Sequence, residues 1–338
     1  MRDNEGNVIL LSRECNGHIL VWGQSGQGKT YFLCRQMEDA VKRGEHLFVF
    51  DYSGSYSEHE LMRQHFKYIN SVCRLDVKKS MIVSVPEDKL QDIVGAITES
   101  LSIHSYFQMK LLEEAVENTI EKNKRMSFPK LYETLETMIQ KEQCSESVNG
   151  NADNLGRLLT RLYPLRGLEH FEIAVVDKDI YHGLTLFDFT GVPMKIRKIL
   201  SELCLSLLWH CISSECELGQ TITFVLDELQ YLSCAENSSL AALLREGRKF
   251  NVSVLMATQF INNYEGRQLQ VLLQAANLVI FKPTVDEIVR VAKCIDRKKC
   301  KDWEKILGNL RRGEAVLKGI FFVNGGKYSQ SAEVIVRI

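Results

Sequence analysis

Residues 19–33 read ILVWGQSGQGKTYFL, in which four apolar residues run into a glycine-rich turn. Gly23 and Gly28 stand five residues apart, and Lys29 and Thr30 follow at once, which satisfies the phosphate-binding pattern G-x-x-x-x-G-K-[ST]. The apolar residues before the turn are typical of a buried strand, and the residues after it suit a helix. Backbone N–H groups at the start of such a helix can hold a phosphate chain. The sequence therefore predicts a strand, a P-loop and a helix that bind a nucleotide.

The P-loop pattern assigns a role to each polar group of the turn. We expect Lys29 to reach the β- and γ-phosphate oxygens and Thr30 to coordinate Mg²⁺. A plain glycine-rich turn between a strand and a helix is the alternative. The residues expected to contact the nucleotide here are Gly23, Ser25, Gly26, Gln27, Gly28, Lys29, Thr30 and Tyr31.

Composition limits the class of protein. Hydrophobic residues make up 45% of the chain and charged residues 25%, which is typical of a globular protein. The net charge of −1 gives no global attraction to nucleic acid, so any such binding must use local patches or a surface created by assembly. No apolar run is long enough for a membrane span, and the N-terminus lacks the apolar core of a signal peptide. The ten cysteines contain no C-x-x-C pair, which favours reduced thiols and a cytoplasmic location.

Hydrophobic periodicity divides the chain into three parts. Residues 1–86 and 173–338 alternate apolar strands with helices, whereas residues 87–172 carry apolar residues at helical spacing and no convincing strand. Near-continuous apolar strands that alternate with helices predict a parallel sheet covered on both faces. We therefore expect one α/β domain that is interrupted by a helical insertion over residues 87–172.

Residues 221–232 read TITFVLDELQYL, an apolar strand that ends in two adjacent acids. This is the Walker B pattern, in which Asp227 would hold the Mg²⁺ shell and Glu228 would orient and polarise an attacking water. Paired acids after a strand are also ordinary helix-capping residues. Behind a P-loop the catalytic interpretation is favoured, and the adjacent glutamate indicates hydrolysis rather than transfer to a second substrate.

Residues 243–259, LLREGRKFNVSVLMATQ, combine a basic helix end with an apolar strand that closes in Gln259. A glutamine at the tip of such a strand can contact the γ-phosphate or the attacking water and so act as a sensor. Its alternative is a simple polar strand end. Arg245, Arg248 and Lys249 form a basic cluster that is either a solvated helix end or the source of an arginine finger for a neighbouring subunit.

Five segments occur in the order seen in the HerA–FtsK superfamily: GQSGQGKT, VFDYSGSYS, VLDELQ, LREGRKF followed by VLMATQ, and NLRRGEAVLKG. Over residues 18–338 the chain resembles HerA-type members, which carry a helical bundle where residues 87–172 lie. The resemblance implies a RecA-like fold and a hexameric ring that uses ATP and Mg²⁺ to translocate double-stranded DNA. Other members of the superfamily drive conjugation and secretion.

The resemblance also implies a role for single residues, each carried over by its motif. Asp51 matches the acidic residue that ends the second strand of the family and is expected near the nucleotide. The family pattern D-x-H-G-E-Y reads DYSGSY here, so Asp51 and Tyr56 are kept while the middle is replaced. Arg248 matches the arginine that acts on a neighbour's nucleotide, and Arg245 is the second choice. The catalytic residues implied are Lys29, Glu228, Arg248 and Gln259, and those implied for Mg²⁺ are Thr30 and Asp227.

Two loops are expected to face the DNA in such a ring. They are SCAENSS (233–239) and FINNYEGR (260–267), in which Asn262, Asn263 and Arg267 could donate to phosphates. Ordinary polar surface loops would look the same. The basic run at 296–305 is interleaved with acids and is expected to be a solvated helix.

These observations predict a cytoplasmic ATPase motor with a nuclease or other effector as partner, in DNA processing or anti-phage defence. HerA proteins commonly begin with a β-barrel on which a nuclease docks, whereas few residues precede the first strand here, so docking through a barrel is not expected. One alternative is an ATP-dependent ring that acts as a scaffold or switch for a partner enzyme. Another is a coupling ATPase of conjugation or secretion, which the lack of a membrane segment disfavours.

Overall fold

The computed structural model describes residues 1–12, 16–56, 72–86, 90–120, 124–144, 151–176, 183–214, 221–327 and 332–338. Its contacts divide the chain into two compact units, which we describe in turn. The first comprises Met1–Val72, Gly183–Thr185 and Glu217–Ile338, and the second comprises Cys73–His182 and Leu186–Cys216.

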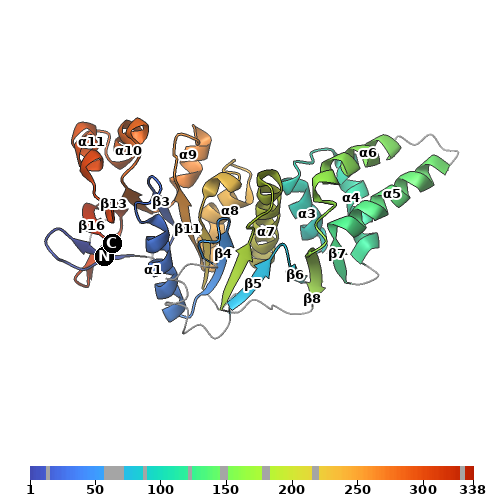
Figure 1. The fold of residues 1–338 in the computed structure, drawn as a ribbon, viewed down its shortest axis with the longest axis horizontal. Coiled ribbons are helices and arrows are strands. Elements are labelled where there is room, and N and C mark those ends of the chain that lie inside the picture. The colour runs from blue at the N-terminus through green and yellow to red at the C-terminus, as the bar shows by residue number, and fades with distance from the viewer. Residues whose placement is uncertain are drawn as a thin grey trace. The chain divides into compact units, whose positions relative to one another are not determined.

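The first unit is built on one sheet with the strand order β1-β16-β13-β12-β3-β11-β10-β4. Neighbouring strands from β12 to β4 are parallel, and those from β12 outward to β1 are antiparallel. Figure 1 shows the two chain ends side by side, where β1 pairs with β16. The strands of this sheet are β1 (Arg2–Asp3), β3 (Ile19–Trp22), β4 (His46–Asp51), β10 (Ile222–Leu226), β11 (Val252–Thr258), β12 (Asn277–Phe281), β13 (Glu314–Gly319) and β16 (Ala332–Arg337).

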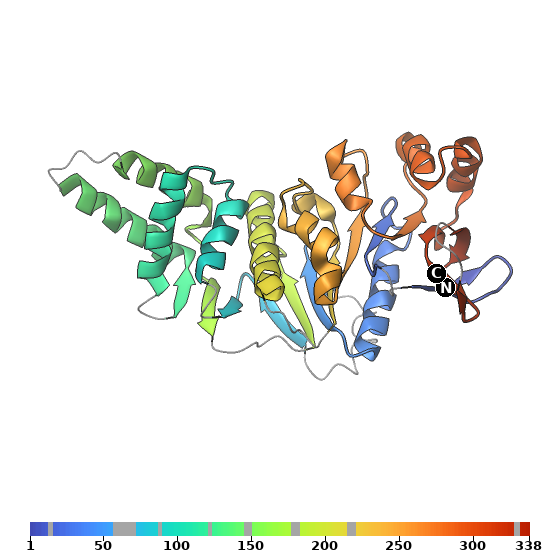
Figure 2. The same cartoon turned by 180° about the vertical axis from the view of Figure 1, so that it is seen from behind.

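The central strands are continuous apolar runs because both of their faces are covered. Every residue of β3, β10, β11 and β12 is buried. Strands buried on both sides are a property of parallel sheets with helices on each face, and Figures 1 and 2 show helices on both sides of the strands. The expected mainly parallel, doubly covered sheet is therefore confirmed.

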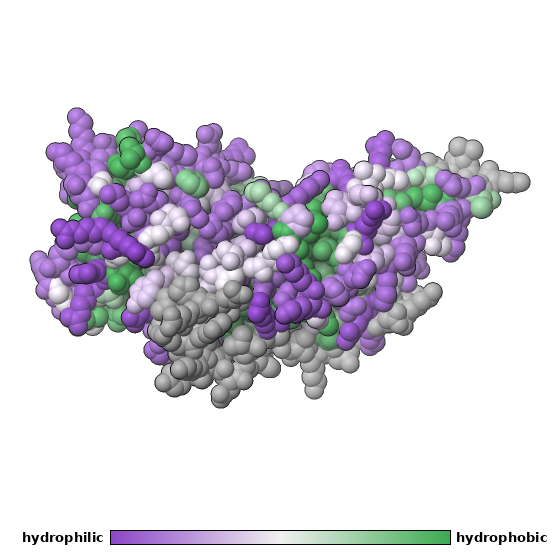
Figure 3. Space-filling view, viewed as in Figure 1, coloured by the Kyte–Doolittle hydropathy of each residue, from purple (hydrophilic) through white to green (hydrophobic). Residues whose placement is uncertain are grey.

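The helices of the first unit follow the parallel strands. They are α1 (Lys29–Lys42), α8 (Ser239–Glu246), α9 (Arg267–Leu272), α10 (Ile288–Ile295) and α11 (Cys300–Asn309). Strand β2 (Ile9–Leu11) forms a small antiparallel sheet with β14 (Phe321–Val323) and β15 (Gly326–Lys327). Figure 3 shows a mainly hydrophilic surface over α10 and α11 with one small apolar patch, and Val285 and Val289 are exposed in this part of the chain. Small exposed patches of this kind are normal.

The second unit combines helices with a three-stranded sheet of order β6-β8-β7. Helices α4, α5 and α6 contact one another as a bundle (Figure 2), and α3 packs on α7. Its elements are β5 (Val72–Asp76), β6 (Met81–Pro86), α3 (Leu90–Ser100), α4 (Tyr106–Ile120), β7 (Arg125–Ser127), α5 (Phe128–Cys144), α6 (Asn151–Leu162), β8 (Phe171–Val176), α7 (Met194–Ser214) and the end of β9 (Leu184–Asp188). No helix among the described residues is both long and apolar enough to cross a membrane.

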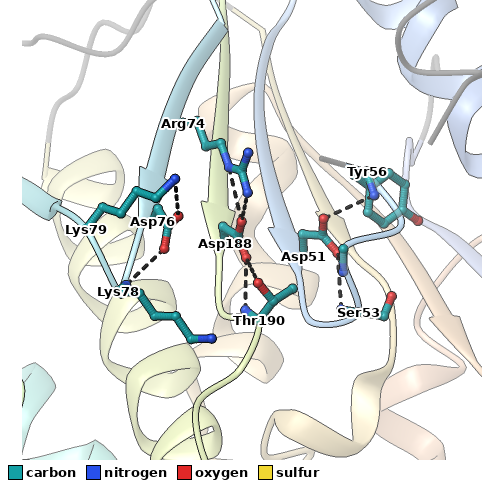
Figure 4. A network of polar contacts seen from close by, with 10 residues as sticks. Asp51, Ser53, Tyr56, Arg74, Asp76, Lys78, Lys79, Asp188 and Thr190 are labelled. Carbon is teal, nitrogen blue, oxygen red and sulfur yellow. Dashed lines mark hydrogen bonds and ion pairs between the residues drawn. The ribbon is translucent and has the colours of Figure 1, made fainter. Parts of the chain in front are cut away.

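The end of β9 is fixed by a buried carboxylate in the second unit. Asp188 accepts hydrogen bonds from the Arg74 guanidinium and from the Thr190 amide and hydroxyl (Figure 4). Burial alone would raise the pKa of Asp188, but the bonds from Thr190 and Arg74 outweigh it and lower this pKa. The cluster holds the chain where it leaves the strand.

The helices expected in residues 87–172 are present, with an added strand. Strand β7 (Arg125–Ser127) pairs antiparallel with β8, and its three residues are too few to show a period in the sequence. The predicted boundaries at residues 86 and 172 follow hydrophobic periodicity, whereas the two compact units follow contacts. Residues 87–89, 121–123 and 145–150 of the predicted insertion lie outside the described residues.

Candidate nucleotide-binding and hydrolysis site

The P-loop connects β3 to α1 and needs glycine at both ends of its pattern. Gly23 has φ 148° and Gly28 has φ 118°, which are angles that other residues rarely adopt. A Cβ at Gly23 would lie 2.6 Å from the Cβ of Phe281, and one at Gly28 would lie 3.2 Å from the Phe281 ring. The two glycines therefore let the loop pack against the end of β12.

Neighbouring segments brace the P-loop through its backbone. The Gln24 amide donates to the Lys282 carbonyl at 3.0 Å, and the Gln27 carbonyl accepts from the Gly313 amide at 3.0 Å. Residues about 250 to 290 positions further along the chain thus hold the loop in shape, and the sequence pattern does not indicate them. Ser25 and Gly26, at the tip of the loop, are exposed.

Lys29 lies inside the P-loop. Its Nζ donates to the Gly23 carbonyl at 2.7 Å and to the Gln24 carbonyl at 3.1 Å, and the side chain is buried. Burial lowers the pKa of Lys29, while the charges of Asp227 and Glu228 act in the opposite direction. The ammonium group is therefore placed where a phosphate chain held by the loop would meet it.

Walker B residues lie beside the first turn of α1. The Thr30 hydroxyl is 3.5 Å from Asp227 Oδ2, so the two predicted Mg²⁺ ligands are brought together. Tyr56, which is itself buried, donates its hydroxyl to the same Asp227 oxygen at 2.8 Å. Burial raises the pKa of Asp227, and the hydrogen bond from Tyr56 opposes that rise.

The oxygen atoms of Thr30 and Asp227 fit Mg²⁺. This ion takes oxygen ligands and is usually held by one or two protein groups together with substrate phosphates and water. No group of three or more His, Cys, Asp or Glu residues with metal-site geometry occurs among the described residues, and Mg²⁺ bound with a nucleotide needs none. Bound there, the ion would neutralise charge on the phosphates.

Asp51 organises the loop that carries Tyr56. Its carboxylate accepts from the amides of Ser53 (3.2 Å), Gly54 (2.9 Å) and Tyr56 (3.1 Å), as Figure 4 shows for Ser53 and Tyr56. Asp51 is fully buried. The described contacts thus give Asp51 a role in shaping the 51–56 loop, and its contact to the nucleotide stays a prediction.

Glu228 follows Asp227 in an unusual backbone conformation, with φ 62° and ψ 62°. Its amide donates to Asp227 Oδ1 at 3.0 Å. The Gln259 amide group donates to Glu228 Oε1 at 2.6 Å, and that of Gln230 donates to Glu228 Oε2 at 2.6 Å. The structure therefore brings the predicted general base and the predicted sensor into direct contact, and it adds Gln230, which the sequence analysis did not single out.

Arg248 lies at the N-terminal end of β11, whereas the P-loop follows the C-terminal end of β3, which runs parallel to β11. It belongs to a short 3-10 helix, η5 (Gly247–Phe250), that enters β11, whereas Gln259 follows the far end of that strand. The seven residues of β11 span about 20 Å at the usual rise of a strand. Arg248 and Arg245 are exposed, and neither forms an ion pair within the described part of the chain.

The remaining predicted residues are placed as follows. Tyr31 lies in α1, where its hydroxyl accepts from Arg35 at 2.8 Å. Lys249 pairs with Glu246 at 3.4 Å. Asn262 accepts a hydrogen bond from Arg290 at 3.1 Å, and both Asn263 and Arg267 are exposed. The contacts of these residues do not test whether they bind DNA, so their DNA-binding role stays a prediction.

Comparisons with known proteins support a common fold. The family described as "Helicase HerA, central domain" matches residues 5–206. VirB4 of Thermoanaerobacter pseudethanolicus is similar in structure, with a TM-score of 0.71, 13% identity, and coverage of 100% of this chain and 95% of that chain. The bacterial conjugative coupling protein TrwBdeltaN70 gives a TM-score of 0.68 and 15% identity, with coverage of 95% of this chain and 85% of that chain.

A second TrwB structure, in complex with ADP and Mg²⁺, gives a TM-score of 0.64 with 14% identity over 95% of this chain and 84% of that chain. Identities at this level establish the fold alone. The RecA-like P-loop fold expected from the sequence is thereby confirmed. No curated protein matched the sequence.

Proposed function

The chain belongs to the family of the HerA helicase central domain, within the HerA–FtsK superfamily of P-loop ATPases, and on this basis we propose a specific activity. We propose that it forms a ring of six copies, as the resemblance to HerA-type members implies, and that this ring hydrolyses ATP to translocate double-stranded DNA. The proposal includes a nuclease or other effector as partner, action in the cytoplasm, and a role in DNA processing or anti-phage defence.

One observation carries the proposal for hydrolysis. Asp227 and Glu228 lie together behind the P-loop, and Gln259 contacts Glu228 at 2.6 Å. Asp227 and Thr30 supply oxygens for Mg²⁺, Lys29 lies inside the phosphate-binding loop, and Glu228 is a second carboxylate that could orient water. ATP and Mg²⁺ are proposed as the bound groups, in keeping with the ADP and Mg²⁺ of the TrwB structure.

The position of Arg248 supports the ring. An arginine about 20 Å from the far end of its own strand cannot reach a phosphate held at that end. It could reach the nucleotide of a neighbouring copy, where a guanidinium would neutralise charge in the transition state. Assembly is therefore part of the proposed chemistry.

A second candidate function is that of a conjugative coupling ATPase. The structural similarity to TrwB, described as a conjugative coupling protein, favours it. A third candidate function is that of a ring that switches a partner enzyme. It predicts that a protein rather than DNA controls hydrolysis.

The test is ATP hydrolysis with and without duplex DNA over a range of salt concentrations. We expect duplex DNA to raise the rate, and the effect to fall steeply with salt because phosphate contacts release counterions. Glu228→Gln should lower kcat by about 10²–10⁴ with ATP binding nearly intact, because it removes the general base. Lys29→Ala should weaken both binding and turnover.

Three outcomes would count against the duplex motor. Stimulation by single strands alone would contradict translocation of double-stranded DNA, and no response to any DNA would favour the switch. Wild-type rates in Glu228→Gln would remove Glu228 from the mechanism. Glu136→Gln, which changes an exposed acid of α5 in the second unit, serves as the matched control and should hydrolyse ATP normally.

A further inference from the structure

Both oxygens of the Glu228 carboxylate are held by glutamine amides. Gln259 donates to Oε1 and Gln230 to Oε2, each at 2.6 Å. Hydrogen bonds from an amide to a carboxylate are charge-assisted and fix the direction of the carboxylate. While both bonds persist, the carboxylate is held in one direction and cannot turn toward a water placed elsewhere in the site, so the arrangement restrains Glu228 by position.

Each of the two glutamines precedes one of the two loops that are expected to face DNA, which are residues 233–239 and 260–267. Gln230 lies in the 3-10 helix η4 (Leu229–Tyr231), which precedes the 233–239 loop. Gln259 follows β11 and precedes the 260–267 loop. Each hydrogen bond on Glu228 is therefore anchored in a segment whose position depends on one of these loops.

An ion pair joins the two loops. Arg267 Nη1 lies 3.1 Å from Glu236 Oε2, with the two side chains 80% and 52% exposed. Ion pairs this exposed contribute little to stability. A nucleic-acid phosphate can therefore replace Glu236 as the partner of Arg267 at small net cost, and the attraction of Arg267 to that phosphate would then move its loop away from Glu236.

We propose that Gln230 is a positioning residue that holds Glu228 away from productive water until polynucleotide phosphate occupies the two loops. The inference rests on the proposed function, because it makes DNA the signal that releases the carboxylate. Binding at Arg267 separates the loops, the loops carry Gln230 and Gln259 with them, and Glu228 becomes free to act on water. Hydrolysis is then slow without DNA, because Gln230 and Gln259 hold the Glu228 carboxylate in place.

The test compares Gln230→Ala with the wild type in the full-length protein, with and without duplex DNA. We expect kcat without DNA to rise about tenfold, because one charge-assisted hydrogen bond on Glu228 is lost. The KM for ATP and the rate at saturating DNA should stay within about twofold of wild type, so the stimulation ratio shrinks. A residue of purely structural importance would not raise the rate in one state alone.

Three further variants sharpen the test. Gln230→Met keeps the length of the side chain but removes the donor without adding charge, so it should behave like Gln230→Ala and replaces it if the alanine variant does not fold. Glu236→Gln weakens the bridge to Arg267 and should raise the DNA-free rate by about two- to threefold. Gln274→Ala, an exposed glutamine before β12, should leave both rates unchanged.

The outcomes separate this inference from the proposed function. If wild-type hydrolysis is not stimulated by DNA, both fall. If the wild type is stimulated and Gln230→Ala keeps its stimulation ratio, the inference alone is overturned. Equal loss of rate in both states, in a protein with wild-type thermal stability, also overturns it, because Gln230 would then support the active arrangement of Glu228.

Discussion

At the scale of single residues, the buried pair formed by Tyr56 and Asp227 connects the 51–56 loop to the metal side of the site. The Tyr56 hydroxyl donates to Asp227 Oδ2, the same oxygen that lies 3.5 Å from the Thr30 hydroxyl. Asp51 fixes the backbone amide of Tyr56 at 3.1 Å. The position of the expected Mg²⁺ ligand thus depends on a residue that does not itself contact the ion.

Tyr56→Phe is expected to raise the Mg²⁺ concentration needed for half-maximal tight binding of ADP by about tenfold. Partners that orient metal ligands typically account for 10- to 100-fold in metal affinity, and the substitution removes the hydroxyl while keeping the ring. Calorimetric titration of ADP at several Mg²⁺ concentrations measures the effect. Affinity for ADP without Mg²⁺ should be unchanged.

Tyr52→Phe is the matched control for that experiment. It removes a buried hydroxyl from the same loop, and the Tyr52 ring stacks on Tyr231 at 4.4 Å rather than reaching Asp227. An unchanged Mg²⁺ requirement in Tyr56→Phe, or an equal change in both variants, would show that Tyr56 does not position Asp227.

Residues that act through local spacing could be predicted, and those that act through long-range contacts could not. The P-loop and the two Walker B acids are contiguous patterns, so their chemistry can be inferred from neighbours in the chain. The partner of Asp227, Tyr56, is 171 positions away, and only the family motif pointed to it. Gln230 stands two residues after Glu228 inside the segment VLDELQ, but nothing in that segment indicates that the glutamine contacts Glu228.

At the scale of elements, His18 ties the start of β3 to the turn that carries Arg248. Its Nδ1 accepts from the Val254 amide of β11 at 3.1 Å, and its ring also bonds the Leu244 backbone of α8. A Cβ at Gly247 would lie 3.5 Å from the His18 ring, so the η5 turn packs directly on it. The bond to Val254 requires a neutral ring, because the nitrogen is the acceptor.

We expect the stability of the protein to fall between pH 6.5 and pH 4 partly because of His18. Burial lowers the pKa of His18 to about 4, so the unfolded chain takes up a proton before the folded one does. Stability is fully present above the unfolded pKa and is lost as the pH falls toward the folded pKa, by about 3 kcal/mol in total. Urea unfolding at pH 4 to 7 measures this loss.

His18→Asn should be less stable at pH 7 but should lose about 3 kcal/mol less on acidification. Other titrating groups contribute equally to both proteins and cancel in the comparison. His104→Asn, at an exposed position, should keep the wild-type pH dependence. If the His18 variant loses as much stability as the wild type, its protonation is not linked to unfolding.

Elements with several turns or fully buried residues were predicted, and very short ones were not. Helix α7 (Met194–Ser214) is long enough for its period to be seen, and strand β11 (Val252–Thr258) is recognised as a nearly continuous apolar run. Strand β7 has three residues and exists because β8 offers it a partner. Its pairing is a property of the packed unit and leaves no pattern in residues 125–127.

At the scale of the whole molecule, the position of Arg248 at the opposite end of β11 from Gln259 supports the proposal that hydrolysis depends on assembly. Arg248→Ala should bind ATP almost normally, still form rings, and hydrolyse ATP about 10³–10⁵ times more slowly, the range known for such fingers. Nucleotide binding, particle size by light scattering and steady-state ATP hydrolysis measure the three properties. A small loss of rate would show that Arg248 is not the finger and would make Arg245, which is exposed at the end of α8, the next candidate.

Mixing Arg248→Ala with Lys29→Ala gives the sharper test of the ring. Each protein alone lacks one half of the site, but a mixed ring contains interfaces where an intact P-loop meets an intact arginine, so activity should partly return. A mixture of Lys29→Ala with Glu228→Gln is the matched control, because both changes damage the same nucleotide site and no interface in the mixed ring is whole. Activity at background in the first mixture, with subunit exchange demonstrated by fluorescence transfer between labelled copies, would exclude action of Arg248 on a neighbour's nucleotide.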